Sequence, residues 1–177
     1  MTSTQEAPAV VPDFGDDDTD RKMCFIASKG TLDMVYPSLV MANAALGEGV
    51  ETHIFFTFWG MDIINKATQD DLQFTWLGNT AMHPPGKKMH MPQGLAGLPG
   101  MTGIATKMMK KQIADLDVPE VPEFVQMIAD AGGHLWACKM SADMMGLEID
   151  DFVEGVEGII TATDFIELCD GGQVIFT

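Results

Sequence analysis

The sequence predicts an α/β protein, a three-layer sandwich in which helices cover a mainly parallel sheet of about five strands. Short apolar runs of strand length alternate along the chain with stretches that place apolar residues at helical spacing. The first strand, helix and strand in succession imply a parallel pair joined by a right-handed crossover. The 177 residues, 46% of them hydrophobic, suffice for one domain with a substantial core.

The first strand and helix follow an acidic N-terminal segment. Residues 22–27 form a continuous apolar run, and the helical pattern behind it extends to about Leu46. We expect Asp33 to cap this helix, so that Pro37 falls in its first turn, where a missing N–H is tolerated. A Gly-Glu-Gly run ends the helix, and residues 50–58, rich in β-branched and aromatic side chains, form the second strand.

The middle of the chain is less regular. Residues 61–67 favour a short helix, and the pattern at 107–113 favours a helix that closes a Gly/Pro/Met-rich insertion at about residues 80–112. The uncharged stretch 93–106 inside this insertion is shorter than the ~20 apolar residues of a membrane span and is broken by glycine and proline. We therefore expect an exposed apolar flap, an oligomer interface or a docking surface; peripheral membrane contact is not expected.

The second half of the chain repeats the alternation of helices and strands. Pro122 lies in the first turn of a helix expected over residues 123–131, and two glycines end that helix. Ser141 is the expected N-cap of the next helix. The remaining expected elements are a strand at 134–138, a turn or short helix at 149–153, a strand at 156–160, a capped helix at 161–169 and a terminal strand at 173–177.

Composition predicts two parts, a disordered acidic tail at residues 1–21 and the α/β domain at residues 22–177. The tail is rich in aspartate and poor in apolar residues. Ten basic against 26 acidic residues give a formal charge of −16, which argues against nucleic acid and anionic membranes as partners. Three cysteines fit no disulfide framework, and no signal-peptide pattern is present, so we expect a reducing, cytoplasmic setting.

Cys138 is the main candidate for chemistry, because it ends a predicted strand immediately before a predicted helix. In open α/β sheets, ligands bind at this edge. The free N–H groups and partial positive charge of a helix N-terminus favour a thiolate, and Lys139 adds a further positive charge. The alternative interpretation is a small buried hydrophobic residue that ends a strand.

The other two cysteines and a nearby histidine are weaker candidates. Cys24 lies inside a predicted central strand, where we expect it to be buried and inert. Cys169 lies near a helix C-terminus, whose dipole opposes a thiolate, so it is either part of the core or a partner thiol that folding brings near Cys138. His134 is not expected to act as a base, because its side chain should point elsewhere.

A second hypothesis is soft-metal binding, since thioether and imidazole groups select Cu(I). The candidate ligands are Met82, His83, Met89, His90 and Met91. Their spacing fits no strong metal motif, and the alternative is that these methionines fill a flexible apolar surface. No motif indicates zinc, a nucleotide-binding loop or a serine hydrolase, and no cofactor is predicted.

Three motifs in this order carry a resemblance to a known family. They are SKGTLD at residues 28–33, FFTFWG at residues 55–60, and ACKMS at residues 137–141 followed by MGL at residues 145–147. Together they resemble the DsrE/DsrF-like superfamily, and more closely its longer subgroup, often labelled peroxiredoxin-like. The resemblance covers residues 22–177. The peroxiredoxin label itself has no support, because no Pro-x-x-x-Thr-x-x-Cys motif is present.

The resemblance implies a small homo-oligomeric α/β protein that carries sulfane sulfur as a cysteine persulfide. The family's sulfur-carrying cysteine corresponds to Cys138, and Cys169 resembles a second cysteine of the longer subgroup. Such sulfurtransferase-like proteins pass sulfur between rhodanese-like or TusA-like partners and the enzymes of sulfur oxidation or tRNA thiolation. The alternatives are a non-catalytic scaffold with structural cysteines and the copper-binding protein described above.

Overall fold

The computed structural model describes residues 21–74 and 93–177. The expected acidic tail and the His/Met run of the copper hypothesis therefore lie outside the described residues, as does the first part of the Gly/Pro/Met-rich insertion.

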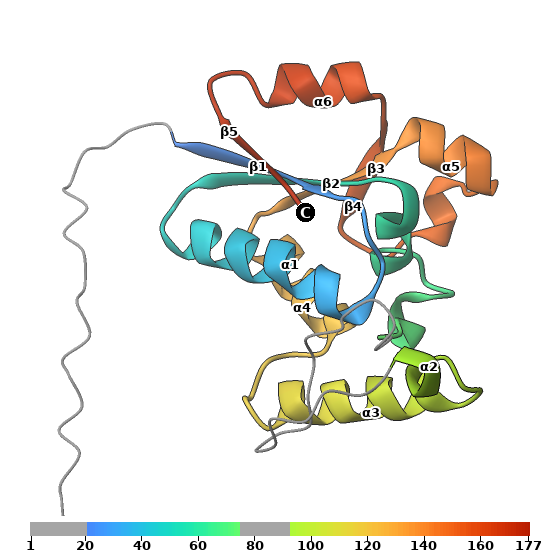
Figure 1. Ribbon diagram of the computed structural model, residues 1–177. Helices are drawn as coiled ribbons and strands as arrows, with labels where there is room; N and C mark the ends of the chain where they lie inside the picture. The colour runs from blue at the N-terminus through green and yellow to red at the C-terminus, as the bar shows by residue number, and fades with distance from the viewer. Residues whose placement is uncertain (1–20, 75–92) are drawn as a thin grey trace, which may run out of the picture.

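A five-stranded sheet forms the centre of the molecule (Figure 1). Its strands are β1 (Lys22–Ala27), β2 (Glu51–Phe56), β3 (His134–Cys138), β4 (Val156–Ile160) and β5 (Gln173–Phe176). They lie in the order β4-β3-β2-β1-β5, and every neighbouring pair is parallel. The prediction of an α/β fold around a mainly parallel sheet is confirmed.

Register aligns the carboxyl ends of the central strands. Ala27 at the end of β1 pairs with Phe56 at the end of β2, and Phe56 also pairs with Ala137 of β3. The residues that follow these pairs, Ser28, Thr57 and Cys138, consequently lie along one edge of the sheet, the edge at which open α/β proteins bind their ligands.

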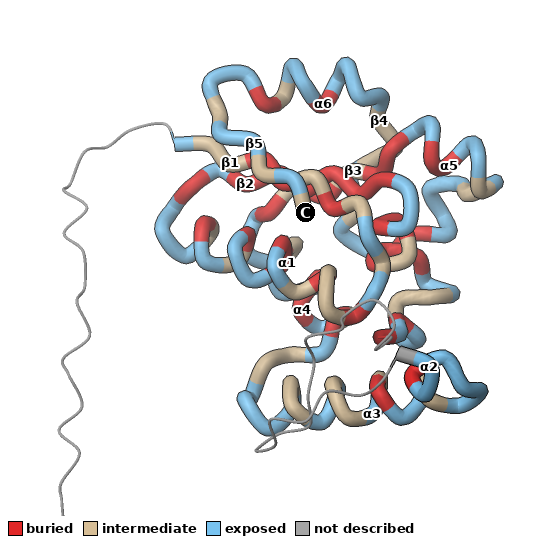
Figure 2. The backbone as a smooth tube through the Cα atoms, viewed as in Figure 1, coloured by how far each residue is buried: buried red, intermediate tan, exposed pale blue. Residues whose placement is uncertain are grey.

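The two faces of the sheet bury different side chains, because successive residues of a strand point to opposite faces. Phe25, Ile54, Phe56 and Leu135 belong to the larger core under α1 (Leu32–Gly47) and α4 (Val121–Asp130). The opposite face carries a smaller cluster that packs under α6 (Ala162–Leu168). Figure 1 shows α6 on the other side of the sheet from α1 and α4, and Figure 2 shows the buried residues concentrated along the strands between them.

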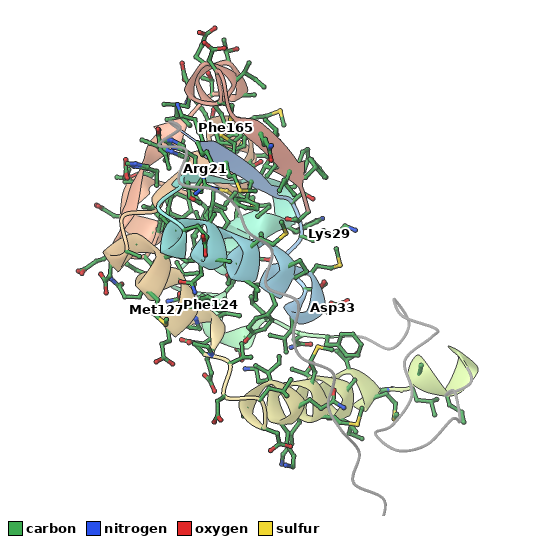
Figure 3. The ribbon with its side chains drawn as sticks, turned by 90° about the vertical axis from the view of Figure 1, so that its left-hand side faces the viewer. Arg21, Lys29, Asp33, Phe124, Met127 and Phe165 are labelled. Carbon is green, nitrogen blue, oxygen red and sulfur yellow. The ribbon has the colours of Figure 1, made fainter. Side chains whose placement is uncertain are left out.

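Side chains on these helices confirm the layers. Phe165 of α6 stacks on Phe55 of β2 with ring centroids 4.6 Å apart, and Phe124 of α4 is buried in the larger core. Figure 3 shows Phe165 and Phe124 on opposite sides of the sheet.

The remaining helices are short or peripheral. They are the α-helices α2 (Gln93–Ala96), α3 (Met101–Ala114) and α5 (Lys139–Met145), and the 3₁₀ helices η1 (Phe58–Ile63), η2 (Gln69–Asp71) and η4 (Ile149–Asp151). Within residues 21–74 and 93–177, no helix is long and apolar enough to cross a membrane.

Three expected helix boundaries are wrong. The helix α1 begins at Leu32 behind Thr31 instead of being capped by Asp33, because the Leu32 N–H donates to the carbonyl of Gln73 at 3.0 Å. Pro37 therefore lies in the second turn. The short helix expected at 61–67 is the 3₁₀ helix η1, displaced toward the end of β2. The third boundary, at Ser141, belongs to the site described below.

Two glycines allow the loops after β1 and β2 to meet at the carboxyl edge. A Cβ atom on Gly60 would lie 2.0 Å from the carbonyl oxygen of Ala27, and one on Gly30 would lie 2.3 Å from that of Trp59. Real Cβ atoms do not approach backbone this closely, so this contact requires glycine on both sides. The packed loops hold Thr57 and the start of η1 beside Cys138.

Candidate functional site at Cys138

Cys138 lies at the junction of β3 and α5. It is the last residue of β3 and the N-cap of α5, with extended backbone angles of φ −74° and ψ 120°. The expected arrangement of strand, cysteine and helix is confirmed, but the expectation that Ser141 caps this helix is wrong. The N-cap is Cys138, three residues earlier than expected, which places the N–H groups of Met140 and Ser141 in the first turn of the helix, where they have no intrahelical partner.

Hydrogen bonds around the Cys138 sulfur favour the thiolate. Burial alone raises the pKa of this thiol. Donation from the Ser141 N–H, from the hydroxyls of Thr57 and Ser141 and from the Met140 N–H outweighs burial, and the pKa lies below its ordinary value of 9.0. Because Cys138 is only 4% exposed, the thiolate is both activated and recessed.

A second layer of contacts orients the two hydroxyls. Thr57 and Ser141 lie 3.2 Å apart through their hydroxyl oxygens, and the Phe58 N–H donates to the Ser141 oxygen at 2.8 Å. This donation occupies an acceptor position of Ser141 and leaves its proton free to point toward sulfur. Phe58 holds a left-handed conformation, with φ of 47°, that costs of the order of 1–3 kcal/mol. The strain is thus located at the residue that orients Ser141.

Lys139 does not contribute as expected. Its ammonium group pairs with the Asp143 carboxylate one turn along α5, at 3.1 Å, and both side chains are exposed. Hydroxyl and amide donors, rather than the lysine charge, lower the pKa of Cys138. Thr57 and the Ser141 hydroxyl were missed in the sequence; the available signal was a polar residue directly after the apolar β2 run.

Cys169 lies beside Cys24 in the small cluster under α6, and both are buried. Burial and a hydrogen bond to the Cys169 side chain raise the pKa of Cys24 from 9.0 to about 12. The expectation that Cys24 is buried is confirmed, and its raised pKa agrees with an inert thiol. Lys22 fixes the end of α6 above this pair by donating to the Leu168 carbonyl at 2.9 Å.

Cys138 lies far from the Cys24–Cys169 pair, although all three cysteines are on the same face of the sheet. Cys24 pairs with His53 of β2, whereas Cys138 lies beyond the Phe56–Ala137 pair and faces Thr57. That offset is roughly 13 Å along the strands, with two interstrand spacings of about 4.8 Å across them. The Cα atoms of Cys24 and Cys138 are therefore roughly 16 Å apart by the same spacings, against less than about 7 Å in a disulfide.

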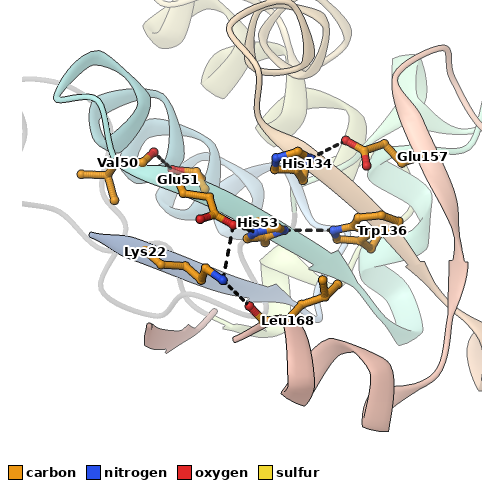
Figure 4. Close-up of polar contacts among 9 residues, drawn as sticks. Lys22, Val50, Glu51, His53, His134, Trp136, Glu157 and Leu168 are labelled. Carbon is orange, nitrogen blue, oxygen red and sulfur yellow. Dashed lines mark hydrogen bonds and ion pairs between the residues drawn. The ribbon is translucent and has the colours of Figure 1, made fainter. Parts of the chain in front are cut away.

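A polar network occupies the amino-terminal half of this face (Figure 4). The Trp136 indole N–H donates to Nδ1 of His53 at 3.2 Å, so Nε2 of His53 carries the proton that it donates to Glu51 at 2.8 Å. His134 stacks on His53 and pairs with Glu157 at 2.6 Å. His134 therefore lies at the opposite end of β3 from Cys138, as expected of a residue that does not act as its base. In the part of the chain that the structure describes, no cluster of three His, Cys, Asp or Glu side chains could hold a metal ion.

Sequence comparisons identify the family of the chain. Residues 19–176 match the model of the DsrE/DsrF/DrsH-like family. The chain is 35% identical over 138 residues to the sulfur carrier protein DsrE2 of Allochromatium vinosum, an alignment that covers 77% of this chain and 86% of that protein. It is 25% identical over 158 residues to the uncharacterized protein YrkE of Bacillus subtilis, covering 88% and 96% of the two chains.

Solved structures show the same fold. The protein of unknown function MTH1491 from Methanobacterium thermoautotrophicum superposes with a TM-score of 0.54 at 12% identity, over 89% of this chain and all of that one. The ychN protein from E. coli superposes with a TM-score of 0.53 at 11% identity, over 89% and 99% of the two chains. The chain belongs to the DsrE/DsrF/DrsH-like family.

Proposed function

We propose that this protein is a sulfur carrier that holds sulfane sulfur as a persulfide on Cys138 and passes it between partner proteins. The observation that supports this most is the recessed Cys138 thiol, whose pKa is lowered by hydrogen bonds at the carboxyl edge of the sheet. The 35% identity to a sulfur carrier protein supports the same assignment.

The proposed loading step is a thiol exchange without net oxidation. The Cys138 thiolate attacks the outer sulfur of a donor persulfide, and a new Sγ–S bond forms as the S–S bond of the donor breaks. The donor leaves as a thiolate that carries the electron pair, and the proton of the donor persulfide stays on the transferred sulfur. An acceptor thiolate then attacks that outer sulfur, and Cys138 departs again as a thiolate.

The residues around Cys138 suit both directions of this exchange. The donors from Thr57, Ser141 and Met140 stabilise the thiolate, which is the nucleophile in loading and the leaving group in unloading. A thiol with a lowered pKa leaves faster, so the same hydrogen bonds promote delivery. Burial of the sulfur limits its access to water and to small oxidants.

The wider setting is part of the proposal. We expect rhodanese-like or TusA-like proteins as donors and acceptors, a homo-oligomer, and a cytoplasmic location. We also propose that residues 1–21 are a disordered acidic tail and that residues 22–177 are the α/β domain. Cys169 remains a candidate second thiol, but its place beside Cys24 supports a role separate from direct exchange with Cys138. We also propose that residues from about 82 to 109, which include the uncharged stretch 93–106, act as a flap that shields the persulfide.

Cold cyanolysis tests the carrier function. Cyanide removes the outer sulfur of a persulfide as thiocyanate and returns the cysteine thiolate, so thiocyanate released from polysulfide-treated, desalted protein counts loaded sites. Wild type and Cys169→Ser should each release about one equivalent from Cys138, and Cys138→Ser none. Equal release from wild type and folded Cys138→Ser would refute the carrier function of Cys138 and favour a scaffold.

A further inference from the structure

Four large apolar side chains are exposed on the two elements that flank Cys138. Phe58 and Trp59 at the start of η1 are 45% and 65% exposed, and Met140 and Met144 on α5 are 60% and 59% exposed. The two elements adjoin, because the Phe58 N–H donates to Ser141 of α5. We call these four residues the apolar rim. Exposed apolar side chains gathered on adjoining elements point to an interaction site.

The apolar rim controls approach to the sulfur. Cys138 is 4% exposed, so a protein thiol reaches it only by seating on the surrounding side chains. Methionine and aromatic side chains suit such a surface, since aromatic rings supply rigid contact area and methionine adapts to different partners. A carrier that exchanges with both a donor and an acceptor requires that adaptability.

The charges around the apolar rim are mainly acidic, the exception being Lys29, which lines a surface pocket together with Trp59 and Asp62. Residues 139–170, which include α5, β4 and α6, contain nine aspartates and glutamates and one basic residue, Lys139; of the nine, Glu157 pairs with His134 at the far end of β3. Lys139 is already paired with Asp143 at 3.1 Å. Asp164, one of these nine, lies in the first turn of α6 at the same edge of the sheet, and Asp62 on η1 adds a further carboxylate. The lysines of α3, Lys107, Lys110 and Lys111, lie on a different element.

This charge distribution favours a basic partner protein over a second copy of the chain at the apolar rim. A second copy of the chain would bring two acidic surfaces together, and like charges at an interface oppose association. A protein with basic residues around an apolar centre would be attracted and correctly oriented.

We propose that the apolar rim is the docking surface for a partner protein that presents its reactive cysteine on an apolar surface ringed by lysine or arginine. The proposal rests on the proposed function, because it identifies the partner class of the Cys138 site. The partner's apolar centre covers Met140, Met144 and the Phe58–Trp59 pair, and its basic groups face the carboxylates of η1, α5 and α6.

Peptide probes test the surface without needing sulfur transfer. Two matched peptides, Arg-Leu-Cys-Leu-Arg and Glu-Leu-Cys-Leu-Glu, are converted to mixed disulfides with an aromatic thiol. Attack of the Cys138 thiolate then releases the aromatic thiol and links the peptide to Cys138. We expect the arginine peptide to react about tenfold faster or more at low ionic strength, with the difference shrinking at high salt.

Matched variants test which residues cause the preference for the arginine peptide. Asp143→Asn and Asp115→Asn each break a lysine–aspartate pair of the same spacing, but only Asp143 borders the apolar rim. We expect Asp143→Asn to narrow the difference between the two peptides and Asp115→Asn to leave it unchanged. Met144→Gln should slow both peptides, whereas Leu116→Gln, an equally conservative change at an exposed residue elsewhere, should not.

Three results would overturn the proposal. They are equal rates for the two peptides, equal effects of Asp143→Asn and Asp115→Asn, and a dimer in sedimentation that Trp59→Gln dissociates, which would assign the apolar rim to a second copy. Failure of the proposed function is read separately by cyanolysis. If the arginine peptide reacts faster but no cyanide-labile sulfur forms, the docking surface stands and the carrier function is refuted. If cyanide-labile sulfur forms but the two peptides react equally fast, only the docking surface is refuted.

Discussion

The hydroxyl of Thr57 should decide how much of Cys138 is ionised at neutral pH. It is one of the donors that lower the pKa of this thiol, and it reaches the end of β3 from the residue directly after β2. Thr57→Val removes this hydroxyl with little change in shape, and Thr57→Ser keeps it. The pair of variants therefore separates the hydrogen bond from packing.

The expected effect follows from the strength of a hydrogen bond to a charged acceptor, about 1.5–3 kcal/mol. Since about 1.4 kcal/mol corresponds to a factor of ten, Thr57→Val should lower the ratio of thiolate to thiol at Cys138 roughly tenfold or more. The sign is fixed by the role of the hydroxyl, which stabilises only the ionised form strongly. The pKa of Cys138 in the variant should therefore be higher than in the wild type.

Alkylation by iodoacetamide measures this ratio, because only the thiolate reacts. The rate at Cys138 is followed against pH by the mass of its peptide, which keeps the signals of Cys24 and Cys169 separate. We expect the Thr57→Val profile to move to higher pH and the Thr57→Ser profile to stay with the wild type. Superimposed profiles of wild type and folded Thr57→Val would refute the hydrogen-bond explanation.

Three further predictions concern stability and pairing. Folding raises the pKa of Cys24 from 9.0 to about 12, so the unfolded chain releases this proton first and the free energy of unfolding should fall as pH rises through that range. Urea titrations should show a smaller fall with pH in Cys24→Ala. The same pH dependence in the variant and the wild type would contradict this prediction. Gly60→Ala should cost about 1–3 kcal/mol, because its Cβ would lie 2.0 Å from a β1 carbonyl oxygen. The Cβ atom of Gly47→Ala meets nothing within 4 Å, so this control should increase the free energy of unfolding by about 0.5–1 kcal/mol. Equal urea midpoints for the two variants would rule out the close approach of Gly60 to Ala27. Peptide mapping of oxidised monomer without reductant should find no disulfide between Cys138 and Cys169, because Cys169 lies beside Cys24, far from Cys138. A Cys138–Cys169 disulfide would contradict that separation.

The sheet and most of its helices were predictable because each element carries its own signal. Mainly apolar runs mark the strands β1, β2, β3 and β5, whereas β4, with the sequence VEGII, carries a weaker signal. The helix α6 has a capping box in which Thr161 and Asp164 bond reciprocally. Ends of helices were less predictable. Tertiary contacts override local caps, as the Gln73 carbonyl does at the first residue of α1.

The candidate site was predictable only in part. Cys138 follows from local order, a strand that turns into a helix. Thr57 does not, because it reaches the sulfur through the register of β2 on β3, which no local pattern encodes. The same holds for Cys169, whose depth along the sheet is set by α6 packing on β1 beside Cys24. Long-range register therefore decides which thiols and hydroxyls meet.

The measurement that tests the central claim most directly locates the carried sulfur. The full-length protein is incubated with polysulfide, digested without reductant, and each cysteine peptide is weighed. We predict the mass of one added sulfur on the Cys138 peptide, removed by reductant and retained in Cys169→Ser. Folded protein with no added sulfur on Cys138, or with the sulfur on Cys24 or Cys169 instead, would contradict the account.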